Sequence, residues 1–455
     1  MGLITKIPRI VMAGERSGVG KSTITVGILL ALKARGLEAQ PFKVGPDFLD
    51  PMHHSILMDR KSRNLDTWMF PGAVKELFVR NSQGADVAVI EGVMGMYDGF
   101  DGVSEEGSTA HLAKTLGSPI ILVLDAHSSA RSLGAVALGF QEYDRNVNVA
   151  AVIFNNVAGE RHLEMLESSL RGVESLGGIP TVEKASLSSR HLGLVPAEED
   201  FSHERYDEIR MMIERNLDID RLLQIARTAG PVEAHAADLF PERKEVATIG
   251  VAKDSAFNFY YEDNLDILRS HGARIEYFSP MSGEVPDVDG LYFGGGYPEV
   301  FAQGLASSVG VREKVRRLAD DGMAVYAECG GMMYACKTIR TLDGREHPMT
   351  GIFDARVEMT GKLQALGYVE AKVLKDCVLS PTGGSARGHV FHYSHVAETS
   401  ETEFAYDLNK QKGIAKNLDG FVRDNSLASY THLHFGSCPR FAENFVHACA
   451  GYRRR

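Results

Sequence analysis

Long hydrophobic runs are absent from this sequence of 455 residues. A membrane-spanning helix needs about 20 consecutive apolar residues, and no stretch of the chain approaches that length. The first residues, Met-Gly-Leu-Ile-Thr-Lys-Ile-Pro, also lack the apolar core of a secretory signal peptide. These absences argue against a membrane protein and predict a cytoplasmic location.

An excess of basic residues is absent as well. The chain has 49 Lys and Arg against 60 Asp and Glu, a net charge of −11, so we expect no general affinity for nucleic acid or anionic lipid. Cysteine is scarce, with five residues that all lie in the last third of the chain and none in Cys-x-x-Cys spacing. Disulfides and a zinc site are therefore not expected, and single reactive thiols become candidates.

The length exceeds what one hydrophobic core usually organises and predicts two or three domains. Around residues 223–244 the apolar pattern weakens into Gly, Pro and Ala without periodicity, which is typical of a linker. We therefore predict a first domain at residues 1–228, a linker at residues 229–244 and a second domain at residues 245–455. No internal repeat and no low-complexity tract interrupts this pattern.

The strongest motif runs from Gly14 to Thr23 and reads Gly-Glu-Arg-Ser-Gly-Val-Gly-Lys-Ser-Thr. It follows one apolar run and leads into another, which predicts a strand, a glycine-rich loop and a helix. In such a loop the backbone N–H groups face phosphates, Lys21 reaches the terminal ones and Ser22 can ligate Mg²⁺. Five residues separate Gly14 from Gly20, one more than in the standard Walker A motif. A chance Gly-Lys-Ser in a surface turn is the alternative.

Acidic residues follow two of the predicted strands. A short strand ending in a Gly-Pro turn puts Asp47 and Asp50 at its carboxyl end, and the apolar run 85–90 leads into Glu91 and then Asp98. Ligands bind at that edge of an open α/β sheet. An acid at the tip of such a strand commonly holds Mg²⁺ directly or through water. Each of these acids can instead cap a helix or fix a turn.

Further apolar runs at residues 119–124 and 149–154 alternate with helical segments, which predicts a parallel, doubly wound sheet. A second α/β pattern starts at residues 246–252 and continues through residues 290–293 and 323–327. The expected fold class is therefore α/β, with a P-loop doubly wound parallel sheet followed by a second α/β domain.

The second chemical motif is Glu-Cys-Gly-Gly at residues 328–331. An apolar strand leads into Cys329 and two glycines, which is typical of a nucleophile elbow because small neighbours tolerate the strained turn. A helix N-terminus and an imidazole can activate a thiol there, and His432 is the candidate base. The glycines of residues 294–296 could supply N–H groups for an oxyanion hole. Cys329 and His432 can equally be a buried structural cysteine and a core histidine.

Taken together, the motifs resemble those of the cobyrinate a,c-diamide synthase family, which includes the Ni-sirohydrochlorin a,c-diamide synthases of coenzyme F430 biosynthesis. The resemblance covers both halves of the chain in order, and the longer P-loop is also similar to that of dethiobiotin synthetase. It rests on residues 14–23, 43–47, 91–95, 257–261, 294–299, 328–331, 388–394 and 432–435.

The family implies an ATP-dependent synthetase domain with a dethiobiotin-synthetase-like P-loop, followed by a class I glutamine amidotransferase domain. The resemblance makes Cys329 the glutaminase nucleophile and His432 its base. In many glutaminases the acid of the catalytic triad lies two residues after the histidine, and that position is His434 here, so the orienting group stays open. The implied donors for the oxyanion and glutamine are Gly294, Gly295 and Gly330.

The implied reaction starts with phosphorylation of a substrate carboxylate by ATP, because a free carboxylate is a poor electrophile. Ammonia released from glutamine then displaces phosphate from the acyl phosphate and forms an amide. Mg²⁺ at Ser22, Asp47 and Glu91, together with Lys21, would stabilise the transferring phosphoryl group. The residues implied to bind ATP are Gly18, Gly20, Lys21, Ser22, Thr23 and Asn155.

Asp50 and Asp98 match family positions that look important for the intermediate or for ammonia capture, and both are assigned to catalysis. The implied acceptor is a tetrapyrrole polycarboxylate, and the sequence does not distinguish cobalt, nickel or no metal in its ring. Cations suited to its carboxylates within the motifs are Lys43, Arg190 and Arg387, although each can also be a solvated surface charge. Assembly as a homodimer stays open.

Two other functions stay open. A P-loop ATPase switch of the partitioning type would have a similar first domain, but it would not need the domain that carries Cys329 and His432. A glutaminase for another acceptor, such as a cobyric acid synthase, would share both domains. The motifs Phe-Asn-Phe-Tyr-Tyr at residues 257–261 and Gly-His-Val-Phe-His-Tyr-Ser at residues 388–394 count against that second alternative.

Overall fold

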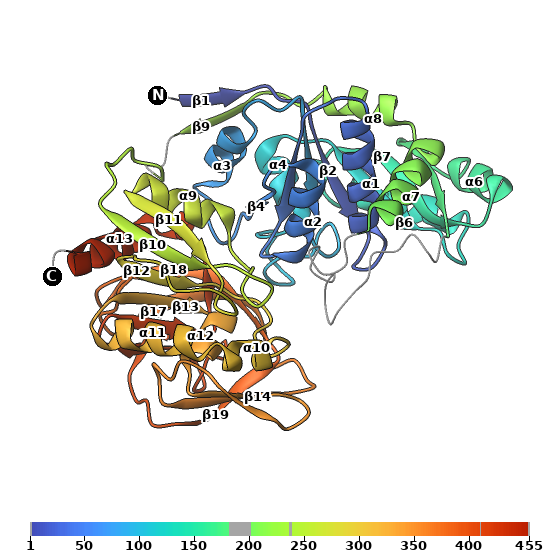
Figure 1. The fold of residues 1–455 in the computed structure, drawn as a ribbon. Helices are drawn as coiled ribbons and strands as arrows, with labels where there is room; N and C mark the ends of the chain where they lie inside the picture. Colours follow the sequence, from blue (N-terminus) through green and yellow to red (C-terminus); the bar gives the residue numbers. More distant parts are fainter. Residues whose placement is uncertain (1, 182–201, 236–238, 410, 454–455) are drawn as a thin grey trace. The chain divides into compact units, whose positions relative to one another are not determined.

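The computed structural model of the chain describes residues 2–181, 202–235, 239–409 and 411–453. The chain divides into two compact units, Met1–Ala237 and Asp238–Arg455. Each unit is built around sheets of its own (Figure 1). Within the described ranges, no helix has both the length and the apolar character needed to cross a membrane.

The first unit is organised by a seven-stranded sheet in the order β4-β3-β5-β2-β6-β7-β8, with every pair parallel. Its strands are β2 (Arg9–Gly14), β3 (Ala39–Val44), β4 (Arg63–Leu65), β5 (Val87–Glu91), β6 (Ile120–Asp125), β7 (Val149–Val157) and β8 (Glu174–Pro180). The central strands are covered on both faces, which explains why they read as continuous apolar runs. The predicted parallel, doubly wound sheet is confirmed.

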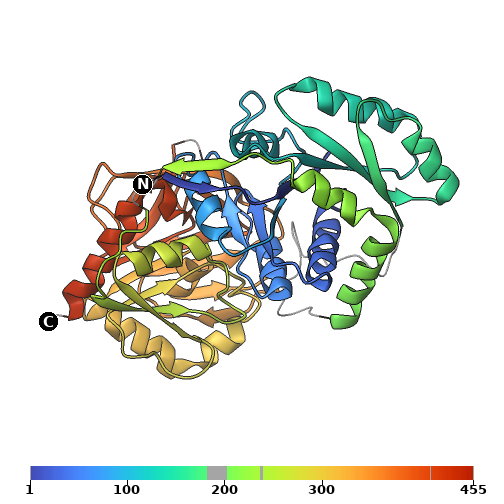
Figure 2. The same cartoon turned by 90° about the horizontal axis from the view of Figure 1, so that it is seen from above.

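Eight helices of the first unit lie within the described residues: α1 (Lys21–Ala34), α2 (Leu49–Met58), α3 (Val74–Asn81), α4 (Thr109–Leu116), α5 (Ser132–Tyr143), α6 (Glu160–Glu167), α7 (His203–Asn216) and α8 (Ile219–Ala226). On α1, Ile24, Ile28 and Leu32 recur at helical spacing and pack against the sheet. Ile213 of α7 joins the same core, and Figure 2 shows α1 in blue beside the green α7. This packing fixes the helix that follows the P-loop.

A small ribbon links the two ends of the first unit. Strand β1 (Gly2–Thr5) pairs antiparallel with β9 (Val232–His235). Part of the predicted linker at residues 229–244 is therefore a strand. Val232 and Ala234 are buried, but four residues are too few for their alternation to stand out from the surrounding Gly, Pro and Ala.

The second unit contains a ten-stranded sheet in the order β11-β10-β12-β13-β22-β21-β20-β17-β18-β23 and a four-stranded sheet in the order β15-β14-β16-β19. The larger sheet comprises β10 (Ala247–Ala252), β11 (Ala273–Phe278), β12 (Gly290–Phe293), β13 (Ala324–Glu328), β17 (Ala365–Val373), β18 (Ser385–His392), β20 (Phe404–Asp407), β21 (Leu418–Arg423), β22 (Ser426–Ser429) and β23 (His432–Leu433). The smaller sheet comprises β14 (Thr338–Arg340), β15 (Glu346–Pro348), β16 (Ala355–Met359) and β19 (Ser394–Thr399).

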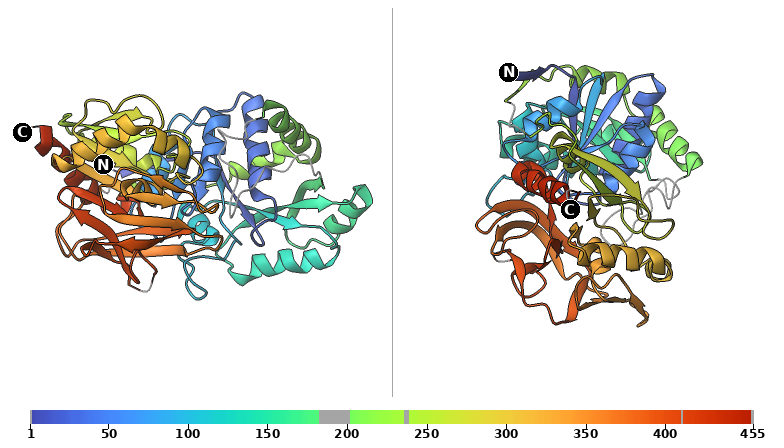
Figure 3. Two further views of the ribbon diagram at one scale, coloured as in Figure 1. Left: turned by 60° about the horizontal axis from the view of Figure 1, so that its bottom comes forward. Right: turned by 60° about the vertical axis from the view of Figure 1, so that its left-hand side comes forward.

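The neighbouring strands β11, β10, β12, β13 and β22 of the larger sheet are parallel, and the remaining pairs of this sheet are antiparallel. The helices are α9 (Glu262–Ser270), α10 (Ala302–Ser307), α11 (Val309–Asp320), α12 (Gly330–Ala335) and α13 (Pro439–Arg453), with a 3₁₀ turn, η2 (Phe435–Ser437). Tyr292 of β12 packs with α9 and α13, whereas Leu291 and Phe293 pack with α11 and α12. Successive side chains of a strand point to opposite faces, so the two groups of helices cover opposite faces of the sheet (Figure 3).

A buried carboxylate anchors the segment that leads into β23. Asp419 on β21 is 0% exposed, and its oxygens accept hydrogen bonds from Tyr430 N at 3.1 Å, Thr431 N at 3.0 Å and the Thr431 hydroxyl at 2.6 Å. Burial raises the pKa of Asp419, and these hydrogen bonds oppose the rise. The carboxylate thus satisfies the donors at the point where the chain leaves β22 for β23.

We predict that Asp419→Asn destabilises the second unit by about 3 kcal/mol, because the new amide turns one acceptor into a donor that faces other donors. The measurement is the free energy of unfolding in urea. Asp424→Asn is the control, since Asp424 is exposed and has a φ of 50°, which Asn adopts readily. The control should leave stability nearly unchanged, and equal losses in both variants would contradict the anchoring role of Asp419.

Candidate functional site

The P-loop of the first unit turns sharply between β2 and α1. Gly18 has a φ of 79° and Gly20 a φ of 93°, and α1 begins at Lys21. A Cβ atom on Gly20 would overlap the side-chain amide of Asn155, and that amide donates to Val19 O at 2.9 Å. Only glycine fits this conformation and this close approach. Asn155, near the end of β7, therefore holds the P-loop in place through its hydrogen bond to Val19.

The ammonium of Lys21 lies inside this loop. It donates to Met94 O at 2.6 Å and to Arg16 O at 3.2 Å. Burial, with repulsion from Lys43 as a second cause, lowers the pKa of Lys21 to about 8. A partly desolvated cation beside a glycine-rich loop and a helix N-terminus is well placed to bind a phosphate. Thr23 lies half-buried on the same first turn of α1.

Next to the loop, oxygen atoms gather around the ammonium of Lys43. Ser22 Oγ lies 2.6 Å from Glu91 Oε1 and 3.4 Å from Asp50 Oδ2. Lys43 Nζ lies 2.9 Å from Glu91 Oε1 and also pairs with Asp50 Oδ2. On the far side, His54 Nε2 lies 2.9 Å from Glu91 Oε2. The structure thus brings together four residues that the sequence analysis singled out, and adds His54, which it missed.

Charge pairing dominates the electrostatics of this cluster. Burial lowers the pKa of Lys43, but Asp50 and Glu91 outweigh burial and raise it above the usual value. Burial raises the pKa of Glu91, but Lys43 and then His54 draw it well below the usual range. Burial raises the pKa of Asp50 well above its usual value, and the nearby Asp47 and Glu91 add to the rise. Glu91 is therefore the ionised carboxylate on which Lys43 depends.

The carboxylates of Asp47 and Asp98 both accept hydrogen bonds from backbone N–H groups. Asp47 Oδ1 accepts hydrogen bonds from Leu49 N at 2.8 Å and Asp50 N at 3.3 Å, so it caps the start of α2. Asp98 Oδ2 accepts from Gly95 N at 2.9 Å and fixes the turn after β5. Asp47 keeps 31% of its side chain exposed and Asp98 is exposed, so either carboxylate can still reach a ligand.

The donors around Ser22 fit Mg²⁺, which takes oxygen ligands and keeps several waters. Ser22 Oγ, on the first turn of α1, and Glu91 Oε1, at the end of β5, are adjacent hard oxygen donors. In the part of the chain that the structure describes, no three His, Cys, Asp or Glu side chains are grouped as a metal cage. A serine and one carboxylate suit an ion that obtains its other ligands from water and phosphate.

In the second unit, Cys329 lies at a strained turn between β13 and α12. Its φ is 47° and its ψ is −100°, a backbone conformation that residues other than glycine seldom adopt. The sulfur Sγ lies 3.8 Å from Phe391 O of β18. A Cβ atom on Gly330, the next residue, would lie 2.9 Å from Pro298 Cδ, so a side chain there would crowd the turn. Strand, strained residue and helix follow one another as a nucleophile elbow requires.

His432 of β23 completes the arrangement around this thiol. Burial lowers its pKa, but interactions with Cys329 and then with Glu328 outweigh burial and raise the pKa to about 9. A Cβ atom on Gly295 would lie 2.5 Å from His432 Cε1, so the glycine loop closes against the imidazole. The ring of His389 stacks on that of His432 with 4.8 Å between centroids. Cys329, His432 and the glycine loop therefore meet.

The hydrogen bonds of the glycine loop correct one sequence-based assignment. Gly294 N donates to the Tyr260 hydroxyl at 2.8 Å, and Gly295 N donates to Phe259 O at 3.2 Å. In this geometry neither N–H is directed at an oxyanion, because the chain at Phe259 bridges the loop. That pairing joins segments far apart in sequence and leaves no local signal. Gly330, the third residue of that assignment, opens α12 directly after Cys329.

His434 was left open as the group that orients the base. Its Nδ1 accepts a hydrogen bond from Gly436 N at 3.1 Å, and its ring packs on Tyr261 at 4.8 Å. Burial lowers its pKa to about 3, so it is neutral. The carboxylate near His432 belongs to Glu328, with Oε2 at 3.9 Å from His432 Nδ1. Sequence reasoning missed Glu328, although an acid in a buried strand directly before a candidate nucleophile is a usable signal.

Two predicted substrate residues remain. Arg387 lies half-buried on β18. Its backbone N–H donates to Ser437 Oγ at 3.0 Å, and its backbone carbonyl accepts a hydrogen bond from His434 N at 3.3 Å. These bonds attach β18 to η2. Arg190 lies outside the described residues.

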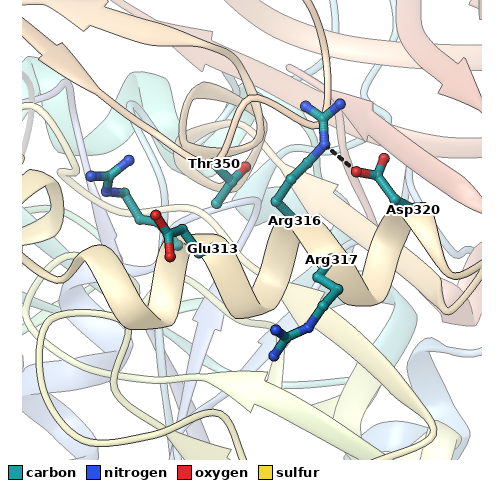
Figure 4. A pocket seen from close by; sticks show the side chains of 6 residues that line it. Glu313, Arg316, Arg317, Asp320 and Thr350 are labelled. Atoms are coloured by element: carbon teal, nitrogen blue, oxygen red, sulfur yellow. Dashed lines mark hydrogen bonds and ion pairs between the residues drawn. The ribbon is translucent and has the colours of Figure 1, made fainter.

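A surface pocket on α11 contains none of the predicted site residues. Figure 4 shows the side chains that line it, which belong to Arg312, Glu313, Arg316, Arg317, Asp320 and Thr350. Arg312 donates to the carbonyl oxygens of Ala306 and Met349, and Arg316 pairs with Asp320 at 2.7 Å. Arg312 therefore holds α11 to its surroundings, whereas the Arg316 pair lies within the helix, and we assign the pocket no part in the chemistry.

Comparison with known proteins follows the same division of the chain. The family described as the CobQ/CobB/MinD/ParA nucleotide binding domain matches residues 10–195. The family described as the CobB/CobQ-like glutamine amidotransferase domain matches residues 248–439. The first match contains the P-loop and its carboxylates, and the second contains Cys329 and His432.

Similar proteins extend over nearly the whole chain. The cobyrinate a,c-diamide synthase of Methanothermobacter thermautotrophicus is 41% identical over 448 residues, covering 96% of this chain and 98% of that protein. The one from Archaeoglobus fulgidus is 41% identical over 446 residues, with 97% of each chain covered. The one from Thermoplasma volcanium is 41% identical over 456 residues, with 99% of each covered. The chain therefore belongs to the cobyrinate a,c-diamide synthase family.

Proposed function

We propose that this chain amidates the a and c carboxylate side chains of cobyrinate, with ATP as the activator and glutamine as the nitrogen donor. Its family consists of glutamine-dependent, amide-forming ligases, and its nucleotide-binding domain implies the use of ATP. The observation that carries the proposal is the 41% identity to a relative named for this reaction, over 96% of the chain. The two clusters described above match the two half-reactions.

The first half-reaction activates the acceptor. The γ-phosphoryl group of ATP passes to a carboxylate oxygen and leaves ADP, and the product is an acyl phosphate. Lys21 and the N–H groups of the P-loop would bind the phosphates and stabilise the charge that moves between them. Ser22 and Glu91, with Asp47, would hold Mg²⁺, which supplies further neutralisation of the phosphate charge.

The second half-reaction supplies ammonia. Cys329 gives its proton to His432, and the thiolate attacks the side-chain amide carbon of glutamine. The C–N bond breaks as His432 returns the proton to the leaving nitrogen, and water later hydrolyses the thioester to glutamate. Ammonia attacks the acyl phosphate, phosphate leaves and the amide remains. We assign Asp50 and Asp98 to this stage, at the intermediate or the incoming ammonia.

Recognition of the macrocycle requires cations that pair with its carboxylate arms. Lys43, Arg190 and Arg387 are the cations proposed to meet its carboxylates. The ammonium of Lys43 already pairs with Glu91 and Asp50, so loss of Lys43 would disturb this cluster before it affects binding of the macrocycle. Arg387 is the member of this group that is described and half-exposed.

Parallel assays with cobyrinate and Ni-sirohydrochlorin test the proposed substrate. With ATP and glutamine present, mass spectrometry should find two added amides on cobyrinate. Amidation of Ni-sirohydrochlorin alone would overturn the choice of macrocycle and keep the ligase. Turnover of ATP without an amide on either compound would instead favour a P-loop ATPase switch.

Cys329→Ala should abolish amidation driven by glutamine, a loss on the order of 10³-fold or more, while amidation driven by an added ammonium salt stays within about twofold. The thiol is needed to release ammonia and has no part in its use. Cys336→Ala is the matched control, because this neighbouring thiol is fully buried against Met332 and should leave both activities intact. Failure of ammonium to rescue Cys329→Ala would show that the thiol has another role.

Glu91→Gln should lower amide formation by about 100-fold and the free energy of unfolding by about 3 kcal/mol, since it leaves the buried Lys43 with less compensating charge. The pKa of Glu91 lies below its unfolded value, so its contribution is present above about pH 4.3 and is lost as the pH falls through the folded pKa. The stability difference from the wild type should therefore shrink in acid.

Unfolding in urea at several pH values, with steady-state assays of amide formation, provides these measurements. Glu160→Gln on the exposed first turn of α6 is the control and should change neither property. A stability difference that grows in acid would contradict the ion pair with Lys43.

A further inference from the structure

Glu328, the last residue of β13, is a buried carboxylate beside the candidate nucleophile. Only 2% of its side chain is exposed. Its Oε1 accepts hydrogen bonds from the Tyr326 hydroxyl at 2.5 Å and from Leu433 N at 3.0 Å, and its Oε2 accepts from the Tyr292 hydroxyl at 2.9 Å. Three donors therefore fix both oxygens, and one of them belongs to the residue after His432.

A buried carboxylate is costly unless donors or a positive charge compensate it. Among the described residues, the side chain within 4.0 Å of Glu328 that can carry positive charge is His432, whose Nδ1 lies 3.9 Å from Oε2. That separation is longer than a hydrogen bond and short enough for a strong charge interaction in a water-excluded site. The carboxylate of Glu328 thus faces Nδ1 of His432. The other ring nitrogen, Nε2, is the one available to Cys329.

We propose that Glu328 is a positioning residue of the glutaminase, which orients the Nδ1–H of His432 and stabilises the imidazolium that forms when Nε2 takes the proton of Cys329. This inference rests on the proposed glutaminase function of the second unit. In many glutaminases an acid two residues after the histidine does this work, whereas here the acid comes from the strand that carries the nucleophile. The net charge of the Cys329, His432 and Glu328 set is unchanged by the proton transfer.

Three other histidines described near His432 have lowered pKa values and carry no charge that could take the place of Glu328. His389, which stacks on His432, has its pKa lowered well below the usual value by burial and by His432. His392, also on β18, has its pKa lowered to about 4, chiefly by burial. His434 is neutral and accepts the Gly436 N–H. Glu328 is the acid that remains.

Glu328→Gln tests the role of the charge, since glutamine keeps the shape and an acceptor oxygen. We expect kcat for glutamine hydrolysis to fall about 100-fold or more, with KM for glutamine changed less than about threefold. Amidation with ammonium salt should be unaffected. The pH profile for alkylation of Cys329 by iodoacetamide should shift to higher pH, because the thiolate and imidazolium lose a stabilising charge.

Two further variants separate positioning from support of the fold. Glu328→Asp keeps a carboxylate and should recover part of the activity and of the alkylation profile. Tyr326→Phe removes a hydrogen bond to the same carboxylate but leaves its charge, so it should keep the wild-type alkylation profile. Thermal unfolding of every variant checks that the second unit is folded.

Near-normal glutamine hydrolysis in Glu328→Gln would overturn the proposal. It would also be overturned if Glu328→Gln and Tyr326→Phe lost activity equally with unshifted alkylation profiles, which indicates a structural role. If the wild-type protein releases no ammonia from glutamine, or Cys329→Ala releases as much as the wild type, the glutaminase function itself fails.

Discussion

Both reactive centres depend on the same constraint, the abrupt end of a buried parallel strand. After β2 ends at Gly14, the P-loop leads the chain into α1, and Gly20 makes the last turn with a φ of 93°. At the end of β13 the turn into a helix falls directly on Cys329, with a φ of 47°. A left-handed conformation costs a residue other than glycine about 1–2 kcal/mol, which the packed strand and helix on either side must offset. The result is a reactive group held at the edge of a sheet.

Buried charge is the second common feature, and the two units compensate it differently. In the first, Glu91 faces Lys43 and His54, so its negative charge is balanced by a cation. In the second, Glu328 is held by two tyrosines and a backbone N–H, with the imidazole of His432 beyond hydrogen-bond reach. A full counter-charge suits a cluster built to hold a metal and phosphates. A carboxylate whose nearby counter-charge is an imidazolium suits a base that gains and loses a proton during its reaction.

Local signals in the sequence predicted the parallel sheet of the first unit, the P-loop and the elbow at Cys329, because glycine positions and apolar runs identify them within a few residues. Features that depend on distant pairing escaped prediction. Strand β9 was assigned to a linker, and the N–H groups of Gly294 and Gly295 were assigned to an oxyanion although they bond to Tyr260 and Phe259. The contact of Glu328 with His432 joins residues about a hundred positions apart, so only the fold reveals it.

The central claim of the proposal is that ammonia released from glutamine at Cys329 forms the amide on the carboxylate that ATP activates at the P-loop. The most direct measurement follows amide-¹⁵N-labelled glutamine through a single reaction with cobyrinate and ATP. We predict one ¹⁵N atom in every new amide, with one ATP hydrolysed and one glutamate formed for each. ATP hydrolysis without label in the macrocycle, or label transfer that does not require ATP, would contradict this account.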